Sequence, residues 1–184
     1  MKRIICLDAG AFSGVSSVVM QHSLLTAAGV YRIDNLEADG RAVITNTVPN
    51  GAFRGFGAQQ SIFAIEALMN HLAAKVGMTP LAFRQLHAAT QGDETCTGGR
   101  FHQYVPLADM LKKAEELSGY SRKYAAYAQP QSGRYRKGIG LSLFLHGCGF
   151  TGSAEKDLLR SQLILYKNAD DTVEILVSNT DIVK

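Results

Sequence analysis

The 184-residue sequence predicts an α+β fold in which mixed sheets pack with helices. Strand-like segments come first, helical patterns fill the middle of the chain, and strand-like segments return near its end. This grouping is typical of α+β proteins, whereas a regular alternation of strand and helix would indicate a parallel α/β sheet. Apolar residues make up 46% of the sequence, so the chain can bury a substantial core.

Six short segments have the apolar, β-branched character of strands, and turn-forming residues separate them. Glu-Ala-Asp-Gly at 37–40 is predicted to be the turn between the second and third strands. Asn-Ala-Asp-Asp at 168–171 is predicted to close a hairpin between the last two. The strands are expected at residues 3–7, 30–36, 41–47, 138–145, 162–167 and 172–178.

Five segments are predicted to be helical, and the one at 59–76 is the clearest. Its apolar residues recur every three or four positions and form one stripe: Ile62, Ile65, Met69, Leu72 and Val76. Thr79 and Pro80 are suited to the N-cap and first position of the helix that follows. The other helices are expected at 18–28, 80–88, 106–118 and from Ser121 to before Pro130, with stops at Gly29, Gly77 and Gly119.

Two further expectations concern the second half of the chain. The helix at 106–118 is predicted to turn five apolar residues inward: Leu107, Met110, Leu111, Ala114 and Leu117. Residues 91–103 are polar and rich in glycine, which favours a boundary between subdomains. We therefore expect one subdomain at 1–90, a linker at 91–105 and a second subdomain at 106–184.

Composition excludes several classes of function. The net charge of +3 is small and the basic residues are scattered, so no nucleic-acid partner is expected. Cys6, Cys96 and Cys148 form no CxxC pair, which argues against a zinc or iron–sulfur site in this chain. They also form no disulfide framework, which favours the reducing cytoplasm. No stretch approaches the roughly 20 apolar residues of a membrane span.

The most informative segment is Asn46–Gln60, NTVPNGAFRGFGAQQ. Residues 46–57, here called the glycine loop, lead directly into the predicted helix at 59–76. Glycine backbone allows a ligand to approach closely, and a helix start adds N–H donors and partial positive charge. Arg54 adds a planar fork of donors, and Phe53 and Phe56 could supply stacking surfaces. Together these features suit a flat, anionic, heteroaromatic ligand.

The sequence GAFRGFG followed by a glutamine-bearing helix resembles the molybdopterin-binding subunit of the xanthine dehydrogenase/aldehyde oxidase family. The likeness is strongest to bacterial xanthine or hypoxanthine dehydrogenase-type chains. Other segments resemble the same family in the same order, at residues 8–19, 30–35, 137–153 and 177–181. The resemblance covers nearly all of the chain but only a middle portion of the family's subunit, so we expect a fragment.

The resemblance implies a molybdenum–molybdopterin cofactor and leaves its dinucleotide form open, with the cytosine dinucleotide as one form. It implies oxidation of a purine such as hypoxanthine or xanthine, a related N-heterocycle or an aldehyde, with water as the oxygen source. Electrons would pass to 2Fe–2S clusters and FAD in other domains of the parent protein or in partner subunits.

Five residues match the family's site positions. Arg54 and Phe53 match positions whose backbone lies against the molybdenum centre, and Gly55 would permit the close approach of the cofactor. Phe56 matches a ring that packs against the bound heterocycle. His22 lies where purine-hydroxylating members often carry an arginine that orients the substrate. A helix histidine bonded to backbone is the alternative for His22.

No catalytic residue is expected in this chain, and no residue of it is expected to bind the metal directly. The family's catalytic glutamate lies downstream of the part that this chain resembles. The family's Gly-Gln-Gly segment is cut off or changed here, because Thr180 and Asp181 are followed by Ile182, Val183 and Lys184. The chain alone is therefore expected to be inactive.

Two alternatives stay open from the residues themselves. Phe53 and Phe56 could form a packing staple and the glycines could simply turn the backbone, which would make the chain a non-catalytic scaffold or interaction domain. Alternatively, the helix start could bind a simple anion or nucleotide phosphate. The second alternative ranks last because neither GxGxxG nor GxxxxGK[ST] is present.

Overall fold

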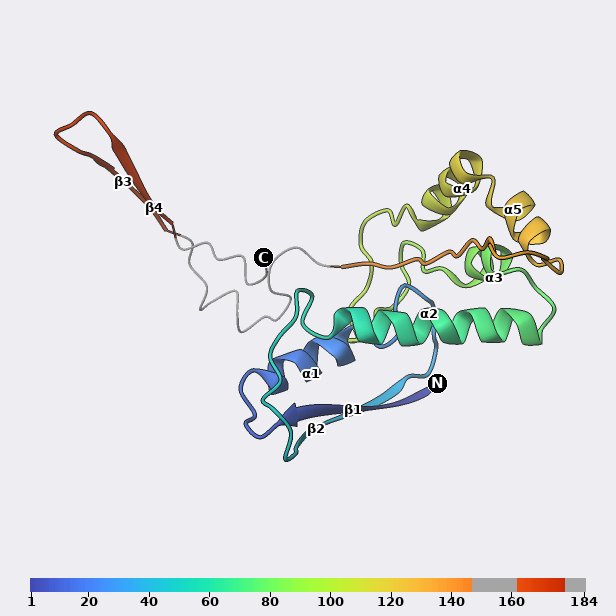
Figure 1. Cartoon of the computed structure of the whole chain (residues 1–184), viewed down its shortest axis with the longest axis horizontal. Coiled ribbons are helices and arrows are strands. Elements are labelled where there is room, and N and C mark those ends of the chain that lie inside the picture. Colours follow the sequence, from blue (N-terminus) through green and yellow to red (C-terminus); the bar gives the residue numbers. More distant parts are fainter. Residues whose placement is uncertain (147–161, 178–184) are drawn as a thin grey trace. The chain divides into compact units, whose positions relative to one another are not determined.

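The computed structural model describes residues 1–146 and 162–177 of the chain. The chain divides into two compact units, Met1–Leu145 and His146–Lys184. The described part of the first unit contains five helices and a two-stranded sheet, and that of the second contains a hairpin (Figure 1). This mixture confirms the predicted α+β class. Among the described residues, no helix is long and apolar enough to cross a membrane.

The sheet of the first unit consists of two parallel strands, β1 (Lys2–Gly10) and β2 (Glu37–Ile44). Parallel strands need a crossover connection, and here it contains α1 (Ser16–Leu25), which packs on both strands. The strand predicted at 3–7 and the helix predicted at 18–28 are thus confirmed, with shifted ends. The carboxyl ends of β1 and β2 place residues 11–15 and 45–50 next to each other, since Ala11 N–H donates to the Thr47 carbonyl.

The prediction of a turn at 37–40 between two strands is wrong. These residues form the first half of β2, and 30–36 is irregular apart from an isolated bridge between Tyr31 and Ala88. Gly40 serves close packing instead, because a Cβ at this position would lie 2.4 Å from Met20 Sδ on α1. The Asp-Gly pair marks a strand position that a helix approaches closely.

The longest helix, α2 (Ala58–Lys75), confirms the helix predicted at 59–76. Ile65 and Met69 of the predicted stripe are buried in the core. Val76 lies beyond the last turn and is 61% exposed. Gly77 ends the helix as predicted, with a φ of +71° that glycine adopts without strain.

The helix after it, α3 (Pro80–His87), confirms the prediction for 80–88. The Thr79 hydroxyl accepts a hydrogen bond from the Ala82 N–H at 3.2 Å, as expected of an N-cap, and Pro80 occupies the first turn. Leu81 and Phe83 join α3 to the core. That core also contains Val30, Tyr31, Ile65, Met69, Ala73, Ala89, Leu107, Leu111, Tyr120 and Leu143.

The next two helices are α4 (Leu107–Ser118) and α5 (Tyr120–Tyr127). Both were predicted, and Gly119 separates them with a φ of +60°. Leu107 and Leu111 are buried as expected, but Met110 is 52% exposed and Leu117 is 77% exposed. The apolar stripe of α4 therefore extends beyond the part of this helix that is buried in the structure.

The N-cap predicted at Ser121 is wrong. Gly119 occupies the cap position of α5, so the helix begins before Ser121. The Ser121 N–H instead donates to the Glu115 carboxylate at 2.9 Å. A carboxylate from the preceding helix thus satisfies a donor in the first turn of α5, where such donors lack a partner within the helix.

Residues 138–145 were predicted to form a strand, and this prediction is also wrong. The segment contains no strand in the structure, and Leu143 is buried within it. The Leu143 N–H donates to Glu66 Oε2 on α2 at 2.8 Å, so a helix side chain takes the place of a neighbouring strand. The apolar pattern that predicted a strand reflects burial of an irregular segment.

In the second unit, β3 (Leu163–Lys167) and β4 (Val173–Val177) pair antiparallel, with Leu163 opposite Val177. The Asn168 N–H donates to the Thr172 carbonyl at 2.9 Å and closes the turn. The predicted hairpin is confirmed. The predicted division into subdomains around 91–105 stays a prediction.

Candidate cofactor-binding site

The glycine loop ends in a tight turn that leads into α2. The Phe56 N–H donates to the Phe53 carbonyl at 2.8 Å, and the Ala58 N–H donates to the Gly55 carbonyl at 2.9 Å. Gly55, Phe56 and Gly57 all have positive φ angles, of 93°, 48° and 86°. A left-handed conformation costs a residue with a Cβ about 1–2 kcal/mol. Phe56 is therefore held in a strained backbone conformation between two glycines.

The structure brings together His22 and Phe56, the two residues predicted to contact substrate. Their ring centroids are 6.4 Å apart and the ring planes stand at 88°, an edge-to-face arrangement. His22 Nδ1 lies 3.4 Å from the Gly55 carbonyl oxygen. Since a carbonyl only accepts, Nδ1 carries the hydrogen in this contact. Contact with substrate stays a prediction for both residues.

The three residues predicted to contact the cofactor are consecutive at the surface of the turn. Phe53 is 65% exposed, Arg54 is exposed and Gly55 is half-buried. The side chains offer an aromatic face and a guanidinium fork, and the start of α2 follows directly. This donor set fits an oxygen-rich anionic group with a flat ring system. The assignment of the three residues to the cofactor stays a prediction.

Packing within the protein also explains why positions 55 and 57 are glycine. A Cβ on Gly57 would lie 2.3 Å from Ser23 Oγ and 2.5 Å from the Val19 carbonyl oxygen, both on α1. A Cβ on Gly55 would lie 2.6 Å from the Gln59 side chain. These glycines allow α1 and the first turn of α2 to close onto the loop, whereas Gly51 has open space around it.

Asp8 fastens the start of the glycine loop to the end of β1. Its Oδ1 accepts hydrogen bonds from the Thr45 hydroxyl at 2.7 Å and the Gly10 N–H at 2.8 Å. Asn50 donates from its side chain to the Asp8 carbonyl at 2.8 Å and from its backbone to the Ala9 carbonyl at 3.1 Å. The Thr45 hydroxyl, followed by the Gly10 N–H, lowers the pKa of the Asp8 carboxyl below its usual value.

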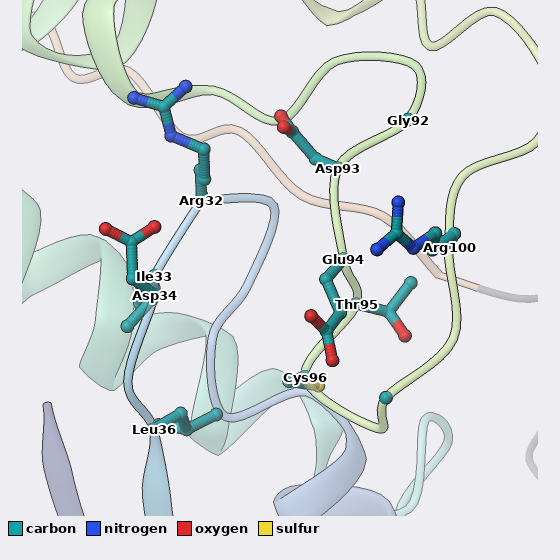
Figure 2. A pocket seen from close by; sticks show the side chains of 11 residues that line it. Arg32, Ile33, Asp34, Leu36, Gly92, Asp93, Glu94, Thr95, Cys96 and Arg100 are labelled. Atoms are coloured by element: carbon teal, nitrogen blue, oxygen red, sulfur yellow. The ribbon is translucent and has the colours of Figure 1, made fainter.

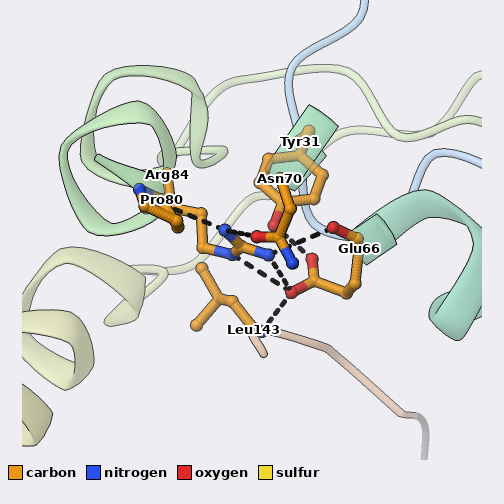
Figure 3. A network of polar contacts seen from close by, with 6 residues as sticks. All are labelled: Tyr31, Glu66, Asn70, Pro80, Arg84 and Leu143. Atoms are coloured by element: carbon orange, nitrogen blue, oxygen red, sulfur yellow. Dashed lines mark hydrogen bonds and ion pairs between the residues drawn. The ribbon is translucent and has the colours of Figure 1, made fainter. Parts of the chain in front are cut away.

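A buried ion pair lies farther along α2. Arg84 on α3 is fully buried, and its Nη2 lies 2.8 Å from Glu66 Oε2 (Figure 3). Arg84 Nη1 donates to Asn70 Oδ1 at 2.9 Å and to the Pro80 carbonyl at 3.1 Å. Arg84 Nε donates to Glu66 Oε2 at 3.1 Å. Each of the three guanidinium nitrogens thus donates at least one hydrogen bond.

The Glu66 carboxylate also accepts hydrogen bonds from two other segments of the chain. The Tyr31 hydroxyl donates to Glu66 Oε1, and the Leu143 N–H donates to Glu66 Oε2 (Figure 3). Burial and then the hydrogen bond to Glu66 raise the pKa of Tyr31 far above its usual value. Glu66 therefore fixes α3, residue 31 and the segment around 143 to one turn of α2.

Sequence reasoning missed this network, although a signal was present. Glu66 lies four residues after Ile62 and three before Met69, on the apolar stripe of α2. A carboxylate on a buried helix face needs a cation or several donors, because an unpaired buried charge is very unfavourable. The sequence alone does not say which of the many arginines provides the partner.

The pockets of the first unit include a charged one and a mainly apolar one. One has a volume of about 450 Å³ between residues 32–36 and 92–100, and Figure 2 shows charged side chains of both signs around it. The other has a volume of about 540 Å³ along α2. It is mainly apolar, and its lining includes Gln59, Ile62, Phe63, Leu141 and Phe144. Gln59 connects this second pocket to the glycine loop through its contact with Gly55.

Histidine, cysteine and carboxylate side chains are the candidates for binding a metal ion. Within 1–146 and 162–177, no three His, Cys, Asp or Glu side chains group as metal ligands. Cys6 and Cys96 are free cysteines and are exposed. Cys148, Thr180 and Asp181 lie outside the described residues.

The sequence pattern of one known family matches residues 1–88, and its description is molybdopterin cofactor-binding domain. Residues 1–88 of the chain belong to this family. The match includes α1, the glycine loop and α2, so His22, Arg54 and Phe56 all lie inside it. The predicted membership among molybdopterin-binding subunits of the aldehyde oxidase and xanthine dehydrogenase type is confirmed.

Similar proteins agree with this membership. The chain is 34% identical to an aldehyde oxidoreductase of Megalodesulfovibrio gigas over 92% of its own length and 18% of that protein. It is 36% identical to the nicotinate dehydrogenase large molybdopterin subunit of Eubacterium barkeri, over 62% of its length and 28% of that subunit. It is 30% identical to a probable xanthine dehydrogenase subunit of Bacillus subtilis, over 79% of its length and 19% of that protein.

Solved structures agree as well. The aldehyde oxidoreductase from Desulfovibrio gigas superposes with a TM-score of 0.73 and 29% identity, over 94% of this chain and 19% of that one. The enzyme from Desulfovibrio desulfuricans gives a TM-score of 0.75 and 27% identity, over 92% of this chain and 18% of that one. The chain therefore spans less than a third of the length of each of these relatives.

Proposed function

We propose that this chain is the cofactor-binding part of a larger molybdenum hydroxylase. The observation that carries the proposal is the turn at 53–57, which presents Phe53, Arg54 and Gly55 together at the surface inside the matched domain. The guanidinium of Arg54 and the backbone around Gly55 would hold the molybdenum–molybdopterin cofactor. When bound, that group would supply the oxidation chemistry, accepting two electrons from the substrate carbon.

We infer that the substrate is a flat N-heterocycle such as hypoxanthine or xanthine, with an aldehyde as the second class. The ring of Phe56 would stack on the heterocycle, a contact worth about 0.5–1.5 kcal/mol beyond the buried area. His22 is edge-to-face with the same ring, and its second ring nitrogen, Nε2, could accept a hydrogen bond from a heterocycle N–H. The names of the relatives include aldehyde oxidoreductase, nicotinate dehydrogenase and xanthine dehydrogenase, which supports this range.

The remaining functions of the enzyme would belong to other domains or subunits. We propose that 2Fe–2S clusters and FAD there receive the electrons, and that the pterin is in the cytosine dinucleotide form. A carboxylate outside this chain would act as the general base, so residues 1–184 would bind and orient without turnover. The proposed location is the cytoplasm.

The proposal is tested by Arg54→Ala in the longer parent protein, purified from a host that makes the molybdenum cofactor. Loss of the fork should lower molybdenum and pterin content or turnover by on the order of tenfold, since charge-assisted bonds are worth about 1.5–3 kcal/mol. Arg122→Ala is the matched control, because Arg122 is an exposed residue on α5. Metal content and turnover equal to those of the control would contradict the proposal.

A non-catalytic scaffold is the second candidate, and the packing of Gly57 against α1 favours it. In that case the glycines would serve only to join α1, the loop and α2. The parent protein would then show no heat of binding for molybdopterin in calorimetry and would contain no molybdenum. Metal in the parent protein would contradict this candidate.

A further inference from the structure

Two consecutive residues of α1 hold the carbonyl groups on either side of Phe56. Ser23 is buried, and its Oγ lies 3.1 Å from the Gly57 carbonyl oxygen and 3.0 Å from that of Val19. The single hydroxyl hydrogen is therefore shared between these two acceptors. His22 Nδ1 lies 3.4 Å from the Gly55 carbonyl oxygen. The last turns of α1 thus reach the residue before Phe56 and the residue after it.

These contacts fall on a strained part of the described backbone. Gly55, Phe56 and Gly57 have consecutive positive φ angles, and only Phe56 carries a side chain that disfavours this conformation. Strain of this kind persists where surrounding contacts determine the backbone. The contacts from His22 and Ser23 restrain the backbone in this way on both sides of Phe56.

The position of α1 is itself fixed from two directions. Gly57 leaves no room for a side chain, since its Cβ would lie 2.5 Å from the Val19 carbonyl oxygen. Arg3 bonds the turn that follows α1 to the first turn of α2, through the Ala27 carbonyl and, at 3.2 Å, the Ser61 carbonyl. A helix held in this way can impose a conformation on the loop that it touches.

We propose that α1 acts as a backbone clamp, in which His22 and Ser23 keep Phe56 in its left-handed conformation. Both are positioning residues that act through the ring of Phe56, and His22 would act this way even without touching a substrate. The link to a ligand rests on the proposed function, because the clamp would set the surface on which a flat heterocycle stacks. The clamp itself is a property of the ligand-free chain.

The clamp is tested by amide hydrogen exchange on the whole ligand-free chain. Ser23→Ala and His22→Phe should each speed exchange of the Phe56 and Ala58 amides by about five- to tenfold, the loss expected for one hydrogen bond. His22→Asn should restore protection, because the asparagine Nδ2 can donate from nearly the position of Nδ1. Ser17→Ala, an exposed serine on the same helix, is the matched control and should change nothing.

Two results would overturn the proposal. Exchange at Phe56 and Ala58 that equals the Ser17→Ala control in both variants would show that α1 does not restrain the loop. Equal acceleration in the β1 amides would show general unfolding instead of release of the clamp. Phe56→Gly provides a further check, because glycine needs no restraint and Ser23→Ala should then leave the local conformation unchanged.

A second arm uses the metal-loaded parent protein with hypoxanthine as the probe. Ser23→Ala should raise KM about tenfold while molybdenum content stays the same, since the stacking surface moves and the cofactor contacts do not. An unchanged KM together with faster exchange would overturn the positioning role. Absence of molybdenum from the unmodified parent would contradict the proposed function, whereas the exchange experiment would still decide on the clamp.

Discussion

Arg84 Nη2 and Glu66 Oε2 lie 2.8 Å apart where neither side chain has appreciable contact with water. Their side-chain exposures are 0% and 7%. The pair joins α3 to α2, and the same carboxylate receives the Tyr31 hydroxyl and the Leu143 N–H. Removing one partner would therefore leave a buried charge without compensation, which is a far larger loss than breaking an exposed pair.

Arg84→Met should lower the free energy of unfolding by about 3–5 kcal/mol, because Glu66 would stay buried without its cation. Urea unfolding followed by circular dichroism measures the change. Lys113→Met is the matched control, since Lys113 forms an exposed pair with Glu116 at 3.8 Å on α4. The control should change stability by less than about 1 kcal/mol. Similar losses for both variants would contradict the importance of burial.

Tyr31 makes the stability of the folded chain depend on pH in the alkaline range. Burial and the hydrogen bond to Glu66 raise the pKa of its hydroxyl in the folded state, so the unfolded chain loses this proton first as pH rises. Stability should therefore be complete below about pH 10 and fall above it, by at most about 1.4 kcal/mol per pH unit. Urea midpoints measured from pH 8 to pH 11 should show this slope.

Tyr31→Phe is the variant that isolates this slope. It should lower stability at neutral pH but lose less stability above pH 10 than the wild type, as the titrating group is gone. Burial also raises the pKa of Tyr120, which contributes equally to both proteins. Parallel pH profiles for the two proteins would contradict the assignment to Tyr31.

Local signals explain which parts of this fold could be predicted from the sequence. Thr79 and Pro80 specify the start of α3 through a cap and a fixed φ, and Gly77 ends α2 through a left-handed turn. Such signals act between residues a few positions apart, so the sequence contains both partners. The hairpin turn at 168–171 was predictable for the same reason.

Two of the errors arose where a distant partner decides the conformation. Gly40 carries a turn signal, but Met20 on a crossing helix makes it a packing position in a strand. Leu143 lies in an apolar run, but Glu66 accepts its N–H where a strand partner was expected. In the candidate site, the sequence indicated His22 and Phe56 separately, and only the fold shows that the two rings meet.

Asp8 should make the glycine loop sensitive to acid. Hydrogen bonds from the Thr45 hydroxyl and the Gly10 N–H lower the pKa of its carboxyl, so their stabilisation is present above the usual aspartate pKa. It is lost as pH falls through the lower folded-state value. Amide exchange, corrected for its intrinsic pH dependence, should show reduced protection of Gly10 and Asn50 below about pH 4.

Asp8→Asn should remove this pH dependence and leave the loop less protected already at neutral pH. Asp39→Asn is the matched control, since Asp39 is a carboxylate on β2 whose partner, Arg41, lies on the same strand. Its exchange pattern at Gly10 and Asn50 should match the wild type. Equal protection in the Asp8 and Asp39 variants would show that the Asp8 side chain does not hold the loop.

Three glycine substitutions separate backbone strain from lack of space around the candidate site. Gly57→Ala combines both, because φ is +86° and the new Cβ would lie 2.5 Å from a backbone oxygen of α1, so the loss should be about 2–4 kcal/mol. Gly77→Ala has only the strained φ of +71° and should lose about 1–2 kcal/mol. Gly51→Ala has open space and no positive φ, so its stability should equal or slightly exceed that of the wild type. Urea unfolding of the three variants measures this order, and a Gly57→Ala loss no larger than that of Gly77→Ala would show that α1 can move away from the loop.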